Sequence, residues 1–311
     1  MGVGMGRAVT GYDLGIDLDD ATVAATVVEA EPMLGMVVVL HGAGEPERSF
    51  FLYEHLAEVL PTVGWGVVRF DRRPGAEGAL ERQAADAATV AAAIRSHMGN
   101  ERLPVALWGF SQGAWAALLA KPLIQDVRFL VLVGFCAVTP GEQMRFATAH
   151  YLRSAGYDAA AIRQLFVLRD AWERFYRGGL PAFEAQRVVD IYREEAWFDL
   201  AYVPGDLPAS TEIEDPAFFD FDPIPLLRQA DVPVLIFYGD EDSEVPVDIS
   251  VAAVSHGSTG QTTIRRLPHA GHDLTREAPA SGDRLDPRYQ SELIKWTRGQ
   301  TAPSDRQSNR S

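Results

Sequence analysis

Five short, nearly continuous apolar runs recur along the chain and constrain its fold more than any other feature of the sequence. Runs of this kind are typical of strands that are buried on both faces of a parallel sheet. Helical patterns at 51–60, 79–97 and 112–120 separate them. This alternation predicts an α/β fold with a doubly wound, mostly parallel sheet. The runs are MVVVL (36–40), WGVVRF (65–70), PVALW (104–108), FLVLVG (129–134) and VPVLIFYG (232–239).

Two segments outside this alternation define the organisation of the chain. Before the runs, YDLGIDL and ATVAATVVEA alternate with period two around Asp19 and Asp20, which predicts an antiparallel hairpin at the sheet edge. Residues 139–228 hold helical patterns and Pro-rich loops but no convincing strand. We interpret them as a mainly helical insertion in a core made of residues 1–138 and 229–300. Residues 301–311 are polar and are expected to be disordered.

The insertion carries half of the aromatic residues of the chain. Such side chains can pack a core within the insertion or line a substrate pocket, and the sequence leaves both uses open. Both ends of the insertion are fixed at the carboxyl edge of the predicted sheet, so we expect it to cover that edge and at least one aromatic side chain to face a pocket. The candidates are Trp172, Phe175, Tyr176, Trp197 and Phe198.

Composition excludes two classes of partner. With 28 basic and 43 acidic residues the net charge is -15, which repels nucleic-acid phosphates and anionic membranes. No apolar run approaches the roughly 18 residues that span a membrane. The only cysteine, Cys136, has no partner for an intrachain disulfide, and we expect a cytoplasmic protein. A homo-oligomer is compatible with this composition.

The segment GFSQG (109–113) directly follows a buried strand and precedes a helix of small residues. Glycines two residues before and after the serine are needed where a tight strand-to-helix turn leaves no room for side chains. That turn presents the hydroxyl of Ser111 at the carboxyl edge of the sheet. We predict that Ser111 is a nucleophile and that the N–H of Gln112, at a helix N-terminus, stabilises an oxyanion.

A second Gly-rich turn, HGAG (41–44), follows the first long apolar run. It can bring another backbone N–H towards the serine, and we assign this second oxyanion donor to Ala43. We interpret His41 as a hydrogen-bonded structural histidine.

Two later loops offer an acid and a base. The carboxylates within DEDSE (240–244) follow the last apolar run, so they emerge at the same edge as Ser111, and PHAGHD (268–273) contributes two histidines. A carboxylate that orients a histidine, which in turn activates a serine, is the arrangement of a catalytic triad. Position along the chain alone does not separate Asp240 from Asp242, or His269 from His272.

Several neighbouring features have a simpler interpretation than catalysis. A metal site at His269, His272 and Asp273 lacks a further, distant group of ligands. Cys136 is expected to be a small buried hydrophobe, and the pair at 72–73 a solvated strand end. Acidic residues of the insertion are expected to be solvated, with recognition of a cationic group such as a peptide amino terminus as the alternative; they are Asp190, Glu194, Glu195, Glu212, Glu214 and Asp215.

With these motifs the sequence resembles the α/β-hydrolase superfamily, and within it the bacterial serine esterases with a helical lid between the sixth and seventh strands. The resemblance covers 36–296 and implies that Asp242 is the acid and His272 the base. The sequence departs from the family at Pro74, where relatives usually have glycine. The motifs are HGAG, FDRRPGAEG (70–78), GFSQG, FDPIPLLRQADVPVLIFYGDEDSEVP (221–246) and HAGH.

The resemblance implies a carboxylic ester hydrolase that forms an acyl-enzyme on Ser111, acts on a small-molecule ester and needs neither cofactor nor metal. We expect short or medium apolar acyl esters to be preferred over charged ones, and kcat/KM to rise with an apparent pKa of about 6 to 7 as His272 becomes neutral. Thioesterases, aminopeptidases, carbon–carbon bond hydrolases and acyltransferases use the same triad and stay open. The presence of all three triad residues argues against a non-catalytic small-molecule receptor.

Overall fold

The computed structural model describes residues 11–76, 78–210, 213, 215–257, 261–276 and 285–300. The predicted disordered tail at 301–311 lies outside these residues, as do Glu212 and Glu214. The described chain forms an eight-stranded sheet in the order β1-β2-β4-β3-β5-β6-β7-β8. Its strands are β1 (Gly11–Asp17), β2 (Thr22–Val28), β3 (Gly35–Leu40), β4 (Trp65–Phe70), β5 (Val105–Phe110), β6 (Val127–Val133), β7 (Val234–Gly239) and β8 (Thr262–Leu267).

Strand β2 is antiparallel to both of its neighbours, and all other adjacent pairs are parallel. The prediction of a mostly parallel sheet is therefore confirmed. Strands β1 and β2 pair along their whole length, with Gly11 opposite Val28 and Asp17 opposite Thr22. They form the predicted hairpin at one edge of the sheet.

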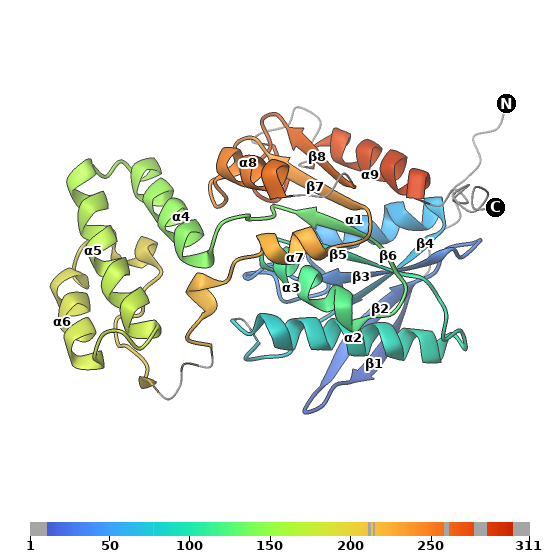
Figure 1. Cartoon of the computed structure of the whole chain (residues 1–311), viewed down its shortest axis with the longest axis horizontal. Helices are drawn as coiled ribbons and strands as arrows, with labels where there is room; N and C mark the ends of the chain where they lie inside the picture. Colours follow the sequence, from blue (N-terminus) through green and yellow to red (C-terminus); the bar gives the residue numbers. More distant parts are fainter. Residues whose placement is uncertain are drawn as a thin grey trace, which may run out of the picture.

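Helices cover both faces of the sheet, which confirms the doubly wound arrangement (Figure 1). Successive side chains of a strand point to opposite faces, so Val38 belongs to one core cluster while Val37 and Val39 belong to the other. The first cluster is completed by α2 (Leu80–His97), α3 (Gln112–Ala120), α7 (Ile224–Gln229) and α8 (Val247–Gly257). The second is completed by α1 (Phe51–Val59), the 3-10 turn η1 (Leu60–Val63) and α9 (Pro287–Gln300).

The parallel strands bring four loops to the same edge of the sheet. Leu40, at the end of β3, pairs with Gly109 near the end of β5. Gly239, at the end of β7, pairs with Leu267 at the end of β8. The loops that follow these strands begin side by side at the carboxyl edge, which is where open α/β sheets bind ligands.

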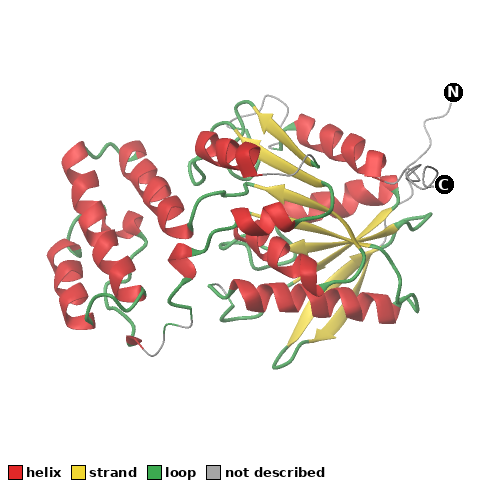
Figure 2. Ribbon diagram, in the orientation of Figure 1, coloured by secondary structure: helices red, strands yellow, loops and turns green. Residues whose placement is uncertain are grey.

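The insertion separates β6 from β7 and lies beside the core, with α4 next to it and α6 farther away (Figures 1 and 2). Thr139 begins α4 with a capping box that it forms with Glu142, and Asp158 caps α5 through the N–H groups of Ala160 and Ala161. No strand falls between β6 and β7 in the described residues. The elements here are α4 (Pro140–Ser154), α5 (Ala159–Tyr176), α6 (Ala182–Tyr192), η3 (Phe198–Ala201) and η5 (Phe218–Asp220), followed by α7, which packs on the sheet.

A buried group of charges links the elements of the insertion. Glu173 on α5 is 2% exposed and accepts hydrogen bonds from Arg169 Nε (3.3 Å) and Arg145 Nη2 (2.9 Å). Arg177 approaches the same carboxylate at 3.5 Å. Arg169 also donates from Nη1 to the carbonyl oxygen of Ala201, so α4, α5 and η3 are joined through this cluster.

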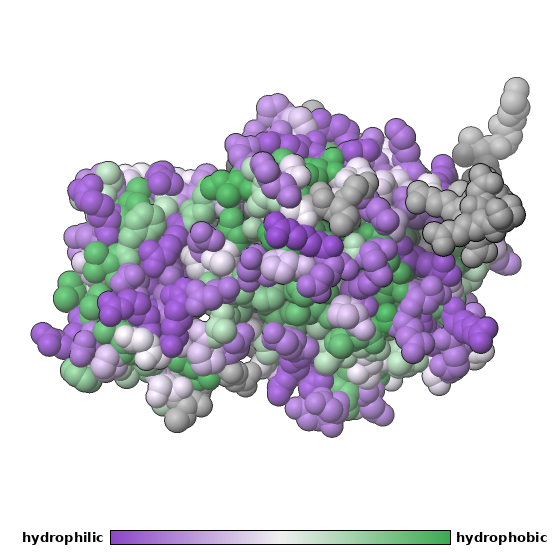
Figure 3. Space-filling view, in the orientation of Figure 1, coloured by the Kyte–Doolittle hydropathy of each residue, from purple (hydrophilic) through white to green (hydrophobic). Residues whose placement is uncertain are grey.

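On the face seen in Figure 3, hydrophilic and apolar residues are interspersed over both the core and the insertion. Among the helices of the described ranges, none combines the length and the apolar character that a membrane span requires.

Candidate active site

Ser111 lies in the tight turn between β5 and α3 and has a positive φ. Its φ of 52° and ψ of -117° are strained for a residue with a side chain. The two flanking glycines explain why the turn can form. A Cβ on Gly109 would lie 2.2 Å from the carbonyl oxygen of Gly113, and a Cβ on Gly113 would lie 2.4 Å from that of Leu40. The strand, the helix and the β3 loop therefore approach too closely for any other residue.

The acid and histidine loops meet beside this turn. His272 Nδ1 is hydrogen-bonded to Asp242 Oδ2 at 2.7 Å. The other carboxylate oxygen of Asp242 accepts two hydrogen bonds of 2.8 Å, from the backbone N–H groups of Glu244 and Val245. These bonds fix the orientation of the carboxylate, whose other oxygen holds the imidazole.

Phe110 and Gly134 pack against the imidazole of His272. Its ring centroid is 5.0 Å from that of Phe110, the residue before Ser111. A Cβ on Gly134 would lie 2.7 Å from its Cε1 atom, so this glycine backs the ring. Within the described residues, Nε2 is buried and hydrogen-bonds to no protein group. It is therefore free to exchange a proton with a nucleophile or a leaving group.

Two further carboxylates face His272 and change its titration. Glu244 Oε2 lies 3.7 Å from Nε2. Burial lowers the pKa of His272, but the charge and hydrogen bond of Asp242, together with the charges of Glu244 and Glu45, outweigh burial and raise the pKa to about 9. The expectation that kcat/KM rises with an apparent pKa of about 6 to 7 assumes an ordinary imidazole, whereas this environment favours a higher value. Burial also raises the pKa of Glu45, and the Glu244 charge adds to this shift.

The other acidic and basic candidates of the two loops point elsewhere. Asp240 pairs with Arg266 at 2.5 Å on the surface. Glu241 pairs with His269 at 2.8 Å, and the His269 side chain is 82% exposed. The two histidines thus have different carboxylate partners, and no group of three or more potential ligands in the described ranges is arranged to hold a metal ion.

The HGAG loop presents its backbone at the same edge. His41 Nε2 donates a hydrogen bond to the carbonyl oxygen of Phe70, and burial lowers the pKa of His41 to about 4, so the ring is neutral and structural. The N–H of Gly42 donates to Tyr53 Oη at 2.9 Å. Among the described residues, the N–H groups of Ala43 and Gln112 have no acceptor within the protein. They are the donors that the sequence assigns to an oxyanion hole.

The interpretation of Arg72 and Arg73 as a solvated strand end is wrong, because their side chains are 6% and 4% exposed, respectively. Arg73 forms ion pairs with Asp86, Asp19 and Asp20. Arg72 donates from Nη1 to the carbonyl oxygen of Gly42 (2.9 Å) and from Nη2 to that of Ala43 (2.8 Å).

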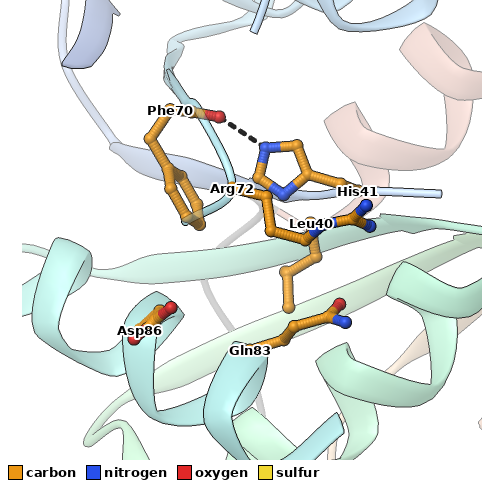
Figure 4. A pocket seen from close by; sticks show the side chains of 6 residues that line it. All are labelled: Leu40, His41, Phe70, Arg72, Gln83 and Asp86. Atoms are coloured by element: carbon orange, nitrogen blue, oxygen red, sulfur yellow. Dashed lines mark hydrogen bonds between the residues drawn. The ribbon is translucent and has the colours of Figure 1, made fainter. Parts of the chain in front are cut away.

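A small cavity adjoins these groups, with His41 and Arg72 on one side and Gln83 and Asp86 of α2 on the other (Figure 4). Its volume of about 10 Å³ suits at most a single water molecule. Gln83 Nε2 donates to both the carbonyl oxygen of Ala76 and the side-chain oxygen of Gln112. The cavity therefore belongs to the support behind the site and is not a substrate pocket.

The five predicted pocket aromatics form the core of the insertion. Trp172, Phe175 and Trp197 are buried in its apolar cluster, and Tyr176 and Phe198 pack against that cluster. The helices of the insertion bury these apolar faces against one another. The prediction that this set contributes to a substrate pocket has no support in these contacts.

Other residues of the insertion, which the sequence did not single out, approach the acid loop. Burial and then the charge of Glu244 raise the pKa of Tyr151 on α4, and the Tyr151 ring lies 5.8 Å from that of Tyr202. Phe146, also on α4, lines a cavity together with Asp242 and Val245. Their positions on α4, the first helix after β6, are the signal that could have identified them.

Cys136 is 2% exposed and follows β6 near this edge. Burial raises its pKa to about 12, so the thiol stays protonated at neutral pH and is unsuited to act as a nucleophile.

Comparison with solved structures finds the same fold in several hydrolases. Est1E from Butyrivibrio proteoclasticus is 15% identical, with a TM-score of 0.58 over 94% of this chain and 100% of that one. An esterase from Pyrococcus furiosus is 13% identical, with a TM-score of 0.56 over 94% and 91% of the two chains. A dienelactone hydrolase from Anabaena variabilis is 13% identical, with a TM-score of 0.54 over 93% and 95%. At these identities the likeness concerns the fold.

No curated protein matches the sequence significantly. A sequence model described as the alpha/beta hydrolase family does match, over residues 37–281. The match spans more than three quarters of the chain, from β3 to the loop that contains His272. The protein is therefore a member of the alpha/beta hydrolase family.

Proposed function

We propose that this hydrolase cleaves carboxylic esters of small molecules through an acyl-enzyme on Ser111. His272 Nε2 takes the proton of the hydroxyl as Oγ attacks the ester carbonyl, and Asp242 holds the imidazole and stabilises its charged form. The N–H groups of Ala43 and Gln112 stabilise the oxyanion of the tetrahedral intermediate. His272 then gives the proton to the leaving alcohol, and activates a water molecule that releases the acid.

One observation carries this proposal. The hydrogen bond of 2.7 Å between His272 and Asp242 lies at the edge of the sheet where Ser111 occupies its strained turn, and the second ring nitrogen of His272 makes no hydrogen bond to a protein group in the described residues. Membership of the family supports hydrolysis as the reaction. The esterases and the dienelactone hydrolase that share the fold are the reason why we propose an ester as the substrate.

Replacing the nucleophile tests the proposal. Ser111→Ala should lose turnover of aryl esters and covalent labelling by a fluorophosphonate while it keeps the thermal stability of the wild type. Ser243→Ala, a serine of the neighbouring acid loop, is the matched control and should be labelled normally. A Ser111→Ala protein that is labelled and active at the wild-type rate would place the nucleophile elsewhere.

The two carboxylates beside His272 favour a second candidate, an enzyme that acts on substrates with a cationic group. Glu244 lies 3.7 Å from the reactive nitrogen, and the charge of Glu45 also acts on the imidazole. An ammonium group near the scissile bond would be attracted to these charges. A screen that compares aryl esters, thioesters and aminoacyl amides of matched size separates this candidate from a simple esterase.

A further inference from the structure

Two consecutive carbonyl groups of the HGAG loop point at one side chain from another strand. Arg72, two residues after β4, donates to the oxygens of Gly42 and Ala43 at 2.9 and 2.8 Å. Its own backbone N–H donates to the carbonyl oxygen of Pro46 at 2.8 Å. Arg72 therefore binds three carbonyl groups of the segment 42–46, and its own side chain is nearly inaccessible to solvent at 6% exposure.

The geometry of the peptide group gives these contacts a consequence for the oxyanion site. In a planar trans peptide the C=O and N–H bonds point in opposite directions. The Gly42–Ala43 peptide is trans, and its C=O bond points at the guanidinium, so the N–H of Ala43 points away from it. Ala43 is exposed whereas Arg72 is buried. The N–H thus lies on the side of the peptide opposite the buried guanidinium, in a residue that is exposed.

The charge of Arg72 adds to this alignment. A cation at the carbonyl end of an amide polarises the group and makes its N–H a stronger donor, because hydrogen bonds in a chain reinforce one another in a low-dielectric environment. A fork of two Nη donors also fixes two successive peptides, which a single-point donor cannot do.

We propose that Arg72 is a positioning residue that orients and polarises the Gly42–Ala43 peptide as one wall of the oxyanion hole. This inference rests on the proposed function. It differs from a role in folding alone because it assigns to Arg72 an effect on the tetrahedral intermediate that it does not have on the bound ester. Removing a direct oxyanion donor lowers kcat about 100- to 1000-fold, and loss of alignment should have a smaller effect of the same kind.

The test compares Arg72→Met with Arg95→Met. Arg95 is also buried, at 8% exposure, and also donates to two backbone carbonyls, those of Leu103 and Gln125. These carbonyls precede β5 and β6, at the opposite edge of the sheet from Ser111. Both variants lose a similar structural support, but only Arg72 contacts the HGAG loop. The measurements are kcat and KM for an aryl ester, Ki for a trifluoromethyl ketone that forms a tetrahedral adduct with the serine, and thermal stability.

We expect Arg72→Met to lower kcat about 10- to 100-fold with little change in KM, and to raise Ki for the ketone by a similar factor. Arg95→Met should lower stability and leave kcat and Ki close to those of the wild type. Arg72→Lys keeps the charge but not the fork, and should fall between the wild type and Arg72→Met. If Arg72→Met does not fold, the ratio of Ki to KM for Arg72→Lys decides the question.

The outcomes separate the two claims. A wild-type protein that neither hydrolyses esters nor reacts with a fluorophosphonate overturns the proposed function, and this inference with it. If the wild type is reactive but the Arg72 variants bind the ketone as tightly as the wild type does, only the inference about Arg72 is overturned. An equal loss of kcat in Arg95→Met would also overturn it, since the effect would then follow from general destabilisation.

Discussion

Three carboxylates control the protonation of the imidazole of His272. Asp242 binds one ring nitrogen, Glu244 of the same loop lies 3.7 Å from the other, and the charge of Glu45, in the loop after β3, also acts on the ring. Their combined charge outweighs the effect of burial, so the cationic form of His272 is favoured in the free protein. At neutral pH only a small fraction of the molecules then holds the neutral imidazole that a general base requires.

This environment predicts an alkaline pH profile for the proposed reaction. Because the pKa of His272 is raised to about 9, kcat/KM should increase as the pH rises through this value and level off above it. Glu244→Gln removes one of the carboxylates and should move the midpoint to lower pH. Glu241→Gln is the control, because Glu241 pairs with the exposed His269. A wild-type midpoint near the ordinary pKa of histidine would contradict this account.

The assignment of the acid predicts a sharp difference between two neighbouring aspartates. Asp242→Asn should lower kcat by about 10⁴-fold, because the imidazole loses its orientation and its counter-charge. Asp240→Asn should change kcat little, since Asp240 pairs with Arg266 at the surface. Steady-state kinetics with one aryl ester compares them. A severe loss for Asp240→Asn and a mild one for Asp242→Asn would show that the acid has been misassigned.

At this scale the sequence could predict the local turn at Ser111, because the glycine spacing there reflects contacts within a few residues. It could not predict the burial of Arg72 and Arg73. An arginine at a strand end is usually solvated, and the partners that bury these two lie far away in the chain, at Gly42, Ala43, Asp86 and the hairpin turn at 19–20. The pKa of His272 also depends on how its own loop meets the acid loop and the loop that holds Glu45. The sequence alone therefore predicts only the ordinary value of a histidine.

At the scale of elements, the insertion depends on a charged residue in its interior. Glu173 carries the negative charge that faces Arg169, whose side chain is 1% exposed. Removing one partner of a buried ion pair leaves the other charge without compensation. We therefore expect Glu173→Ala to destabilise the protein by about 3 to 5 kcal/mol. Asp170→Ala should change stability by less than about 1 kcal/mol, because its ion pairs are exposed.

Denaturant unfolding and hydrogen exchange at α4 and α5 measure this difference. Exchange in the core strands should change less than exchange in the helices of the insertion. If Glu173→Ala were as stable as Asp170→Ala, relaxation or water entry would compensate for the lost carboxylate. The buried cluster would then not be what holds α4 to α5.

The sequence predicted the central strands well and the edge strand β8 poorly, for a physical reason. Central strands are covered on both faces and are apolar throughout, as in β3 and β7. Strand β8 has the sequence TTIRRL and is only partly buried, so it lacks the apolar run on which the prediction relied. The aromatic residues of the insertion show the same limit, because their sequence does not indicate which of two apolar environments they enter.

At the scale of the whole molecule, the net charge of -15 acts in the same direction as the carboxylates of the site. Both repel anionic substrates and attract cationic ones. The fold class itself was predictable, because a parallel sheet follows from apolar runs spread over most of the chain. The position of the insertion's side chains relative to the site was not, since it depends on packing between segments that share no local pattern.

Because of this negative charge, we expect kcat/KM to differ between matched aryl esters with neutral, anionic and cationic acyl groups. The anionic ester should have the lowest kcat/KM, and the difference should shrink as ionic strength rises from about 0.01 to about 0.5 M and screening shortens the range of the field. Glu244→Gln should narrow the difference further, whereas Glu241→Gln should not. Discrimination that does not change with salt would indicate that shape, and not charge, selects the substrate.

Because Cys136 is buried, a fluorophore can be attached to this chain at one chosen position. Its only thiol is inaccessible and protonated, so alkylating dyes have no natural target. A cysteine placed at Ile191, which is 68% exposed on α6, would be the single reactive thiol of the protein. A fluorophore attached there would respond to its surroundings without a background signal. Whether the surroundings of α6 change when a fluorophosphonate reacts with the protein could then be read from the emission of single molecules.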